Sequence, residues 1–278
     1  MLLVADSGST KTDWRLINTQ GIIPVSTIGL NPYHISSAQI LTELNSSLLV
    51  QYSSEVSQVY FYGAGCSSEE KKEIIKSALS QFFKNGKIEV NHDLLAAARA
   101  TCGKEEGMAG ILGTGSNSCL FDGENIIANI PALGYILGDE GSGVDMGKAL
   151  LKKYLNKELA SNLSEKLEKE YSLDLNSILN SVYKEPLPNR YLAQFTKFIK
   201  KHENYVEMDN IVKECFQHFF DLTICKYENY KQYKLNAVGS IANVFNNQLK
   251  EVAQINDIEL GRVIQSPIDE LVLYHTRD

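Results

Sequence analysis

The sequence predicts an α/β protein that contains two copies of one β-β-β-α-β-α-β-α unit. First, strand-like and helix-like segments follow in this order over the first third of the chain. Second, the order restarts near residue 106 with two apolar segments around a Gly-containing turn. Third, the turns VADSGST and ILGTGSN match in layout, with Gly8 aligned on Gly115, 107 residues later. Two copies at a domain-sized offset indicate a duplicated fold.

The first copy consists of short apolar segments separated by turns and by amphipathic stretches. Strands are expected where apolar residues run between Gly-containing turns, and helices where apolar residues recur at helical spacing. Ser36 or Ser37 provides an N-cap for the first helix, and Asp93 begins the last one with an acidic residue. The eight elements are expected at 2–6, 12–18, 22–29, 36–50, 58–65, 69–83, 88–91 and 93–100.

The second copy carries a long insertion. It begins with apolar strands on both sides of GTGSN, followed by NIIANI as a third strand. Lys-, Glu- and Leu-rich helical sequence then occupies about 145–230. The unit resumes with a strand, a Gly turn and a helix in YKLNAVGSIANVF, then the strand IELGRVIQ and a helix with Pro267 in its first turn. We therefore expect one lobe over 1–105 and a second over 106–278.

Composition and charge narrow the range of functions. With 278 residues, of which 44% are hydrophobic and 22% charged, the chain has the composition of a globular protein of one or two domains. A net charge of −7 argues against general binding to nucleic acid. No stretch reaches the ~18 apolar residues of a membrane span, and MLLVA lacks the basic segment of a signal peptide. The five cysteines are odd in number and scattered, so we expect a cytoplasmic protein without a disulfide framework.

The first turn, SGSTKT, has the residues of an anion site. Gly8 lets backbone amides converge on an anion without hindrance from a Cβ atom. Asp6 would repel a bare phosphate but suits a phosphate that carries Mg²⁺. Hydroxyl donors and a positive charge come from Ser9, Thr10, Lys11 and Thr12. The alternative is a polar hairpin turn with a solvated lysine. The segment is not a Walker A loop, because it leads into a strand.

Two later turns have similar features. Thr114, Gly115 and Ser116 form a second candidate phosphate cradle, for which an ordinary Gly hairpin is the alternative. Gly239 and Ser240 occupy a strand-to-helix turn in NAVGSIANVF, where Gly permits a flat ring to approach the backbone. That turn is alternatively a normal strand-to-helix connection. On a duplicated scaffold, the two cradles would grip one nucleotide tail.

Three acidic residues are candidates for work on a substrate. Asp93 lies between a strand and a helix, so its carboxylate can accept a proton from a substrate hydroxyl, or simply cap the helix. The Gly-rich segment GYILGDEGSGVDMG joins the α/β part to the helical part. Its Asp139 and Glu140 can hydrogen-bond substrate hydroxyls, or Asp139 can help to order the site. The alternative is a domain linker with a capping Asp.

Taken together, DSGSTKTDW, LGTGSN, LGDEGSG and AVGSIA resemble four motifs of the BadF/BadG/BcrA/BcrD ATPase family, in particular its N-acetylglucosamine kinase-like branch. This family is part of the actin/hexokinase/Hsp70 ATPase superfamily, and the resemblance covers about 2–264. It implies a duplicated ribonuclease H-like (actin-like ATPase) fold with two lobes around a nucleotide cleft. It also implies the use of ATP and Mg²⁺ to phosphorylate an amino sugar hydroxyl, with a 6-phosphate as product.

The resemblance implies roles for residues of this chain. Asp6 would organise Mg²⁺ through water, and Asp93 would take the proton from the attacking sugar hydroxyl. Asn31 and Asp139 match positions that hydrogen-bond the sugar. Phosphoryl transfer depends mainly on positioning and charge neutralisation, which such a set supplies. The residues expected at the nucleotide are Gly8, Ser9, Thr10, Lys11, Thr114, Gly115, Ser116, Gly239 and Ser240.

Several alternatives stay open. In PALGYILGDEGS, Leu133 stands where N-acetylglucosamine kinases carry the Trp of GGWGHMMGDEGS, so glucosamine and N-acetylmuramic acid are also candidate substrates. Redox-linked ATPases of the same family hold an iron–sulfur cluster with cysteines at a dimer interface. Cys102 and Cys119 are the only pair close in sequence in the relevant half of the chain. A non-catalytic nucleotide-dependent binding protein is the third hypothesis. A homodimer is neither indicated nor excluded.

Overall fold

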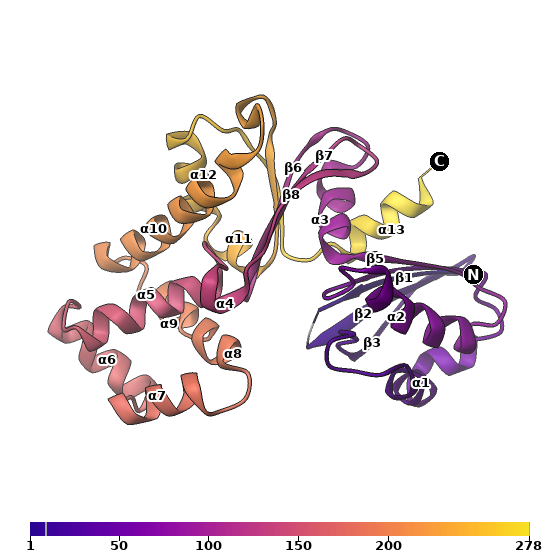
Figure 1. The fold of residues 1–278 in the computed structure, drawn as a ribbon, viewed down its shortest axis with the longest axis horizontal. Helices are drawn as coiled ribbons and strands as arrows, with labels where there is room; N and C mark the ends of the chain where they lie inside the picture. The colour runs from indigo at the N-terminus through magenta and orange to yellow at the C-terminus, as the bar shows by residue number, and fades with distance from the viewer. Residues whose placement is uncertain (9, 278) are drawn as a thin grey trace. The chain divides into compact units, whose positions relative to one another are not determined.

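The computed structural model describes residues 1–8 and 10–277, which form two compact units, each with one five-stranded sheet (Figure 1). Unit 1 comprises Met1–Glu105, Gly123–Asn125 and Ser266–Asp278. Unit 2 comprises Glu106–Asp122 and Ile126–Gln265. Both units combine strands and helices, which confirms the predicted α/β class.

The sheet of unit 1 brings the ends of three parallel strands together. Its strands are β1 (Leu2–Ser7), β2 (Lys11–Asn18), β3 (Gly21–Ile28), β4 (Gln58–Gly63) and β5 (Lys87–His92). Their order is β3-β2-β1-β4-β5; β1 is antiparallel to β2 and parallel to β4, and β4 is parallel to β5. The carboxyl ends of β1, β4 and β5 therefore meet at one edge, which is where open α/β sheets bind ligands.

Four α-helices cover the two faces of this sheet. In Figure 1, α1 (Ser37–Ser46) and α2 (Glu69–Phe82) lie on one face, and α3 (Asp93–Cys102) and α13 (Ile268–Thr276) on the other. A capping box between Ser36 and Gln39 begins α1, as expected from the N-cap residues. The helix ends earlier than predicted, because Ser47 caps a separate 3₁₀ helix at Leu48–Tyr52. The core under α1 and α2 is closely packed and includes Leu3, Trp14, Ile40, Phe61 and Leu79.

The sheet of unit 2 repeats the topology of unit 1. Its strands are β6 (Gly107–Leu112), β7 (Ser116–Phe121), β8 (Ile126–Ile130), β9 (Leu235–Val238) and β10 (Leu260–Ile264). Their order is β10-β9-β6-β7-β8, so β6 to β10 take the places of β1 to β5. The pairing directions also match, since β6 is antiparallel to β7 and parallel to β9. The predicted duplication of the fold is therefore confirmed.

The turns after β1 and β6 are equivalent, but in a different register from the predicted one. Gly8 directly follows the last paired residue of β1, and Gly113 directly follows that of β6. The amide of Gly8 donates to the Lys11 carbonyl, and the amide of Gly113 donates to the Gly115 carbonyl, both at 3.0 Å. Gly8 thus corresponds to Gly113 rather than to Gly115. The first turn is one residue longer, which shifts the alignment of the sequence motifs.

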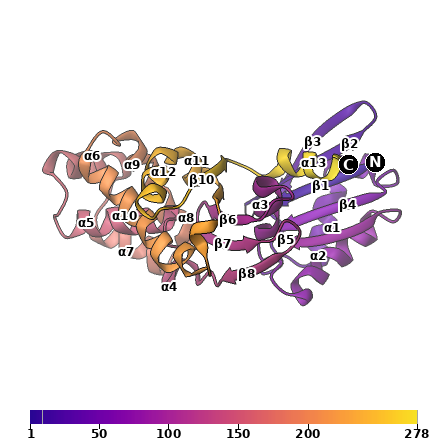
Figure 2. The ribbon, with the colours of Figure 1, turned by 90° about the horizontal axis from the view of Figure 1, so that it is seen from above.

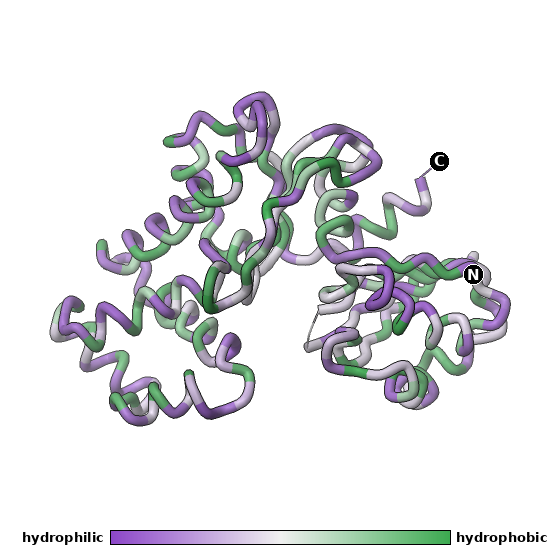
Figure 3. The backbone as a smooth tube through the Cα atoms, viewed as in Figure 1, coloured by the Kyte–Doolittle hydropathy of each residue, from purple (hydrophilic) through white to green (hydrophobic). Residues whose placement is uncertain are grey.

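Helices fill the chain between β8 and β9 and continue beyond β9. They bury one face in a core around Phe216, Phe219 and Phe220, and Figure 3 shows hydrophobic and hydrophilic residues alternating along them. The region begins with α4, before the predicted start at about 145. The sequence does not reveal α4, because four helical residues are too few to show a periodic pattern. The α-helices are α4 (Gly134–Leu137), α5 (Gly143–Leu155), α6 (Ser161–Tyr171), α7 (Leu175–Tyr183), α8 (Pro188–Ala193), α9 (Thr196–Lys201), α10 (Val206–Leu222), α11 (Ser240–Val244) and α12 (Asn246–Ile255). None of the described helices is long and apolar enough to cross a membrane.

The last helix, α13, belongs to unit 1, whereas the sequence analysis assigned 266–278 to the second lobe. It lies against α3, β1 and β2 (Figure 2), and Ile268 at its start is buried. Near its end, His275 stacks on Tyr60 with ring centroids 3.6 Å apart. The Nε2 atom of His275 also lies 2.7 Å from the hydroxyl of Tyr62, which is 213 residues away in sequence. Local sequence patterns carry no information about such distant contacts.

Candidate active site

Three carboxylates gather near the carboxyl ends of the parallel strands in unit 1. Asp6 is the penultimate residue of β1, and Asp93 follows β5 directly as the first residue of α3. Asp13 lies on β2, paired with Asp6 in the antiparallel ladder. The negative charges of Asp93 and Asp13 both act on Asp6. The parallel order of β1, β4 and β5 therefore brings together two residues that are 87 positions apart in sequence.

Asp6 has the most perturbed carboxylate in this group. Burial, followed by the charges of Asp93 and Asp13, raises its pKa to about 7, and Lys11 opposes this only in part. The Lys11 ammonium is itself paired with Asp13, at 2.8 Å from Oδ2. A buried carboxylate with acidic neighbours gains from a bound cation, which would offset both the desolvation and the repulsion.

Asp93 is not the N-cap of α3. His92 takes that position, and its Nδ1 atom accepts the amide of Leu94 at 3.2 Å. The Oδ1 atom of Asp93 is buried and lies 3.0 Å from Nδ1 of His92, which can donate to it when that nitrogen carries a proton. Burial opposes the charged form of His92, but the hydrogen bond and charge of Asp93 raise the pKa of His92 overall. The capping alternative for Asp93 is therefore wrong, and its carboxylate is available for other work.

Asn31 lies in the loop after β3, beside the loop after β4. Its side chain is buried, and its Oδ1 atom accepts the amide of Tyr33 at 3.0 Å and packs against Gly65. Cys66, which follows Gly65 in sequence, is buried. Burial, and then the charge of Asp93, raises the pKa of its thiol to about 12. Asn31 and Asp93 thus both border the Gly65–Cys66 segment at one edge of the sheet.

Two hydroxyl side chains, those of Ser7 and Thr12, hold this edge of the sheet together, a role that the sequence did not indicate. The hydroxyl of Ser7 is buried, lies 2.7 Å from the hydroxyl of Thr12 and accepts the amide of Leu30 at 3.0 Å. Ser7 therefore joins the two strands of the first turn to the residue before Asn31. In the sequence, Ser7 directly follows the strand expected at 2–6, and no other signal marks it.

In unit 2, the Gly-rich acidic segment folds against the second turn. The amides of Gly143 and Val144 donate to the carbonyls of Gly113 at 2.9 Å and Thr114 at 3.1 Å. The Oδ1 atom of Asp139 accepts the amide of Ser116 at 3.1 Å. Burial raises the pKa of Asp139, and the Ser116 amide and the Lys148 charge oppose this rise. Asp139 therefore orders the second turn, which is one of the two roles considered for it.

The third Gly turn lies beside the second one. Gly239 has a φ of +127° and packs against the Leu112 carbonyl, and a Cβ atom there would lie 3.2 Å from the Gly113 amide nitrogen. Only Gly fits both this backbone conformation and this close approach. Ser240 then begins α11. Three separate motifs of the sequence thus meet at the carboxyl ends of β6 and β9.

The structure brings the predicted residues together in two groups, one in each unit. The unit 1 group contains Asp6, Gly8, Asn31 and Asp93, with Lys11 held in an ion pair. Ser9 lies outside the described residues, and the carbonyl of Thr10 beside it accepts the amide of Gly29 at 3.1 Å. The unit 2 group contains Thr114, Gly115, Ser116, Asp139, Gly239 and Ser240.

The donor set suits a hydrated cation rather than a caged one. Among the described residues, no group of three or more His, Cys, Asp or Glu side chains is placed to hold a metal ion. Mg²⁺ commonly keeps several waters and is bound by one or two carboxylates together with substrate phosphates. Asp6, with its raised pKa and acidic neighbours, fits that arrangement.

Comparisons with known proteins agree with this fold. No protein-family model matches the chain. A Clostridium acetobutylicum protein named N-acetylmuramic acid/N-acetylglucosamine kinase is 27% identical, over 93% of this chain and 95% of its own length. A Chromobacterium violaceum crystal structure, provisionally named N-acetylglucosamine kinase, covers 98% of both chains at a TM-score of 0.73 and 16% identity, which shows the fold alone.

A Porphyromonas gingivalis crystal structure with the same provisional name is much more similar. It is 41% identical to this chain, covers 99% of this chain and 98% of its own, and has a TM-score of 0.94. The similarity therefore extends through both copies of the duplicated unit and through the helical region. The chain thus belongs to the family of the P. gingivalis protein, a kinase family of the actin-like ATPase superfamily.

Proposed function

We propose that the protein transfers the γ-phosphoryl group of ATP to a hydroxyl of an amino sugar, with the 6-phosphate as product. The observation that carries the proposal is the pair of equivalent Gly turns after β1 and β6, together with the carboxylates of Asp6 and Asp93 at one edge of the unit 1 sheet. The names of the C. acetobutylicum and P. gingivalis proteins support it. We also place the chain in the N-acetylglucosamine kinase-like branch of the BadF/BadG/BcrA/BcrD family.

The proposed nucleotide contacts use backbone amides more than side-chain charge. In unit 1 they involve Gly8, Ser9 and Thr10, whereas Lys11 is already paired with Asp13. In unit 2, the turn formed by Thr114, Gly115 and Ser116 is held by the segment at Asp139. Gly239 and Ser240 would lie at the adenosine, and the close packing of Gly239 on the Leu112 backbone fixes this turn beside the second one. Amides fixed in this way can bind phosphate oxygens without reorganisation.

Asp6 is the residue that we propose to hold hydrated Mg²⁺. Mg²⁺ bound with ATP neutralises the charge that develops on the transferred phosphoryl group. Because burial and acidic neighbours raise the pKa of Asp6 to about 7, the ion competes with a proton for this carboxylate near neutral pH, and its affinity should rise with pH.

Asp93 is the proposed general base. It would accept the proton of the sugar hydroxyl as the hydroxyl oxygen attacks the γ-phosphorus and the bond to the β-phosphate oxygen breaks. The side chain of Asp93 is 27% exposed, so its carboxylate is not fully enclosed and a substrate hydroxyl can approach it.

The sugar contacts are proposed at Asn31 and Asp139. Asn31 lies in the same unit as Asp93, and its buried amide is held by the Tyr33 backbone. Asp139 already accepts the Ser116 amide, so its second carboxylate oxygen is the one proposed for a sugar hydroxyl. Leu133 is 60% exposed and cannot supply the stacking surface of a Trp, which keeps N-acetylmuramic acid and glucosamine open beside N-acetylglucosamine. A protein that consumes ATP and a free sugar is expected in the cytoplasm.

A coupled kinase assay over a panel of sugars tests this function. The panel would contain N-acetylglucosamine, N-acetylmuramic acid, glucosamine and glucose, each with ATP and Mg²⁺. We expect ADP release that depends on one or more amino sugars, and a phosphomonoester at the 6-position by NMR. Absence of stimulation by every amino sugar would overturn the proposal.

The redox-linked alternative is not favoured by the cysteines. Cys119 lies on β7 and is completely buried, so it does not face a surface where a second subunit could share a cluster. Cys102 is the last residue of α3 and is only partly buried. A cluster between subunits needs several accessible thiolates.

A further inference from the structure

Unit 2 contains a hollow of about 400 Å³ that no proposed role uses. It lies among α4, α5, α7 and α8, and none of its lining residues belongs to the Gly turns at the ends of β6 and β9. Its floor is formed by Leu151, Ile178 and Leu192, which belong to the core of unit 2. The volume falls within the roughly 300–1,000 Å³ that is typical of small-molecule sites.

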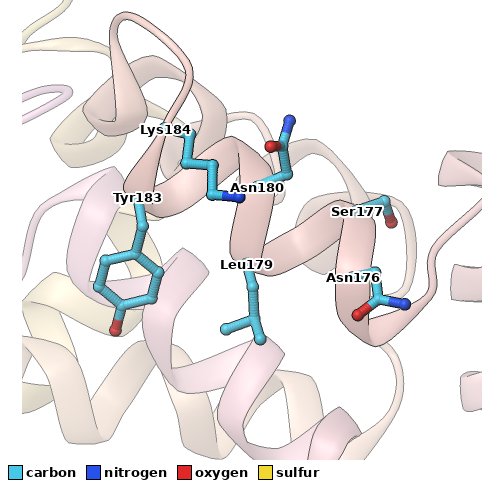
Figure 4. A pocket seen from close by; sticks show the side chains of 6 residues that line it. All are labelled: Asn176, Ser177, Leu179, Asn180, Tyr183 and Lys184. Carbon is cyan, nitrogen blue, oxygen red and sulfur yellow. The ribbon is translucent and has the colours of Figure 1, made fainter.

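The walls of this hollow are apolar and face solvent. Ile136 of α4 is 73% exposed, and Leu179 and Tyr183 of α7 are 43% and 79% exposed. Leu179 and Tyr183 extend to the same side of α7, as Figure 4 shows. Contiguous exposed apolar side chains around a concavity are typical of a surface that is covered by a ligand or a partner.

Two lysines add positive charge to this apolar surface. Lys148 and Lys152 both line the hollow and are one helical turn apart on α5. The ammonium of Lys148 donates to the Tyr135 carbonyl at 3.1 Å. Within the described part of the chain, neither lysine forms an ion pair with a carboxylate. The hollow therefore combines an apolar body with a positive edge.

We propose that this hollow binds a small amphipathic anion, with its apolar body between α4 and α7 and its carboxylate at Lys148 and Lys152. Charge complementarity selects this occupant over a neutral apolar one, because two ammonium groups border an apolar floor and neither forms a close ion pair in the described part of the chain. A protein partner would need acidic and apolar residues in the same arrangement. The site is independent of the proposed kinase reaction and needs neither nucleotide nor sugar.

A second hollow along α7 shows where a longer occupant would extend. It is lined by Asn176, Ser177, Leu179, Asn180, Tyr183 and Lys184, so Leu179 and Tyr183 border both hollows (Figure 4). Its lining comes from α7 and the residue after it, and this single wall cannot enclose a ligand. We therefore assign the anchoring contacts to the first hollow.

Isothermal titration of the unliganded protein with octanoate at low ionic strength tests the proposal. Octan-1-ol has the same apolar body without the charge, and acetate has the charge without the body. We expect one octanoate per chain, and both other compounds to bind at least tenfold more weakly. Equal binding of octan-1-ol, or no binding of octanoate, would overturn the proposal.

Matched variants locate the site. Lys152→Gln should weaken octanoate binding about fivefold, the scale of an exposed ion pair, whereas Lys153→Gln, next to it but outside the lining, should not. Leu179→Ser should weaken binding at least fivefold, whereas Leu175→Ser, also exposed on α7, should not. Equal effects within each pair would contradict the assignment. So would a dimer by sedimentation that Leu179→Ser dissociates, because the hollow would then be an interface between copies.

Discussion

The Nδ1 atom of His92 lies 3.0 Å from the Oδ1 atom of Asp93. The same nitrogen is placed to accept the amide of Leu94, at 3.2 Å. A nitrogen without a proton can accept the Leu94 amide, and a nitrogen with a proton can donate to Asp93, but it cannot do both. Whether Nδ1 of His92 carries a proton therefore decides whether the imidazole caps α3 or holds the proposed catalytic carboxylate.

Asp93→Asn should abolish phosphoryl transfer and spare nucleotide binding. Asn has nearly the same shape but cannot accept a proton, so we expect kcat to fall by about 10²- to 10⁴-fold, the usual range for a general base. The dissociation constant for ATP, measured by calorimetry, should change less than about twofold. A variant that retains a tenth or more of the wild-type kcat would remove Asp93 as the base.

His92→Asn should reduce stability more at acidic than at alkaline pH. Asn is a good N-cap, so the cap of α3 is retained while the titrating group is lost. Because the pKa of His92 is raised in the folded protein, its contribution is fully present below about 6.5 and is lost as pH rises through the folded value. Urea unfolding at pH 5.5 and 8.5 should show a deficit in the variant that shrinks at pH 8.5. A deficit that does not depend on pH would contradict the assigned charge interaction.

Asp6→Asn should produce a protein that is more stable at pH 8 but inactive. The unfolded pKa is 3.8 and the folded value is about 7, so the wild type loses stability as pH rises from about 4 to about 7. The variant does not titrate and should gain roughly 2–4 kcal/mol over the wild type at pH 8, and little at pH 4. Urea unfolding without nucleotide or Mg²⁺ measures the difference.

The same variant provides a control for the metal assignment. For the wild type, the affinity for ADP with Mg²⁺ should rise between pH 6 and 8, because the ion binds the ionised carboxylate and displaces its proton. The affinity of Asp6→Asn should be weaker and flat with pH, apart from the titration of the nucleotide itself. Parallel pH dependence in both proteins would argue against Asp6 as the Mg²⁺ residue.

Gly239→Ala should lower both stability and nucleotide affinity. The φ of +127° is unfavourable for Ala, and the new Cβ would press on the Leu112 carbonyl and the Gly113 amide. We expect a loss of about 2–4 kcal/mol in the free energy of unfolding, as for strain at a special backbone position. Gly113→Ala is the matched control, since a Cβ there meets no atom within 4 Å. It should retain stability to within about 1 kcal/mol.

The contact of α13 with the sheet should weaken in acid. Burial, and then the charge of Arg99, lowers the pKa of His275 to about 4. A lowered His pKa contributes stability above the unfolded value of 6.5, and this stability is lost as pH falls toward 4. Amide exchange of α13, corrected for the intrinsic pH effect, should show less protection at pH 5 than at pH 7.5. His275→Gln should show no such change, and an equal change in that variant would exclude His275 as the cause.

The sequence predicts the strands well because each is an apolar run bounded by turn residues, a pattern that depends only on neighbours. The resemblance of four motifs implies that Asp6 and Asp93 serve one reaction, and the parallel order of β1, β4 and β5 brings them to one edge of the sheet. The remaining features depend on contacts between distant residues. The register of Gly8 with Gly113 needed the strand pairing, and the position of α13 needed the stack of His275 on Tyr60.

Two details of the site illustrate the same limit. Asp93 is a candidate N-cap in the sequence, yet it is the first residue of α3, and His92 is the N-cap. Asp139 looks like a substrate ligand or a linker residue, and only the folded loop shows its bond to the Ser116 amide. Both differences arise from one or two hydrogen bonds, which residue type alone does not determine.

The return of α13 to unit 1 has a consequence for protein synthesis. Residues 1–105 leave the ribosome before the whole of unit 2, whereas α13, which covers one face of their sheet together with α3, is made after it. During translation, the surface that later receives Ile268 and His275 stays uncovered while the whole of unit 2 is made. The unit that is synthesised first is thus completed last, and a message truncated before residue 266 yields a first unit that chaperones and proteases can recognise as unfinished.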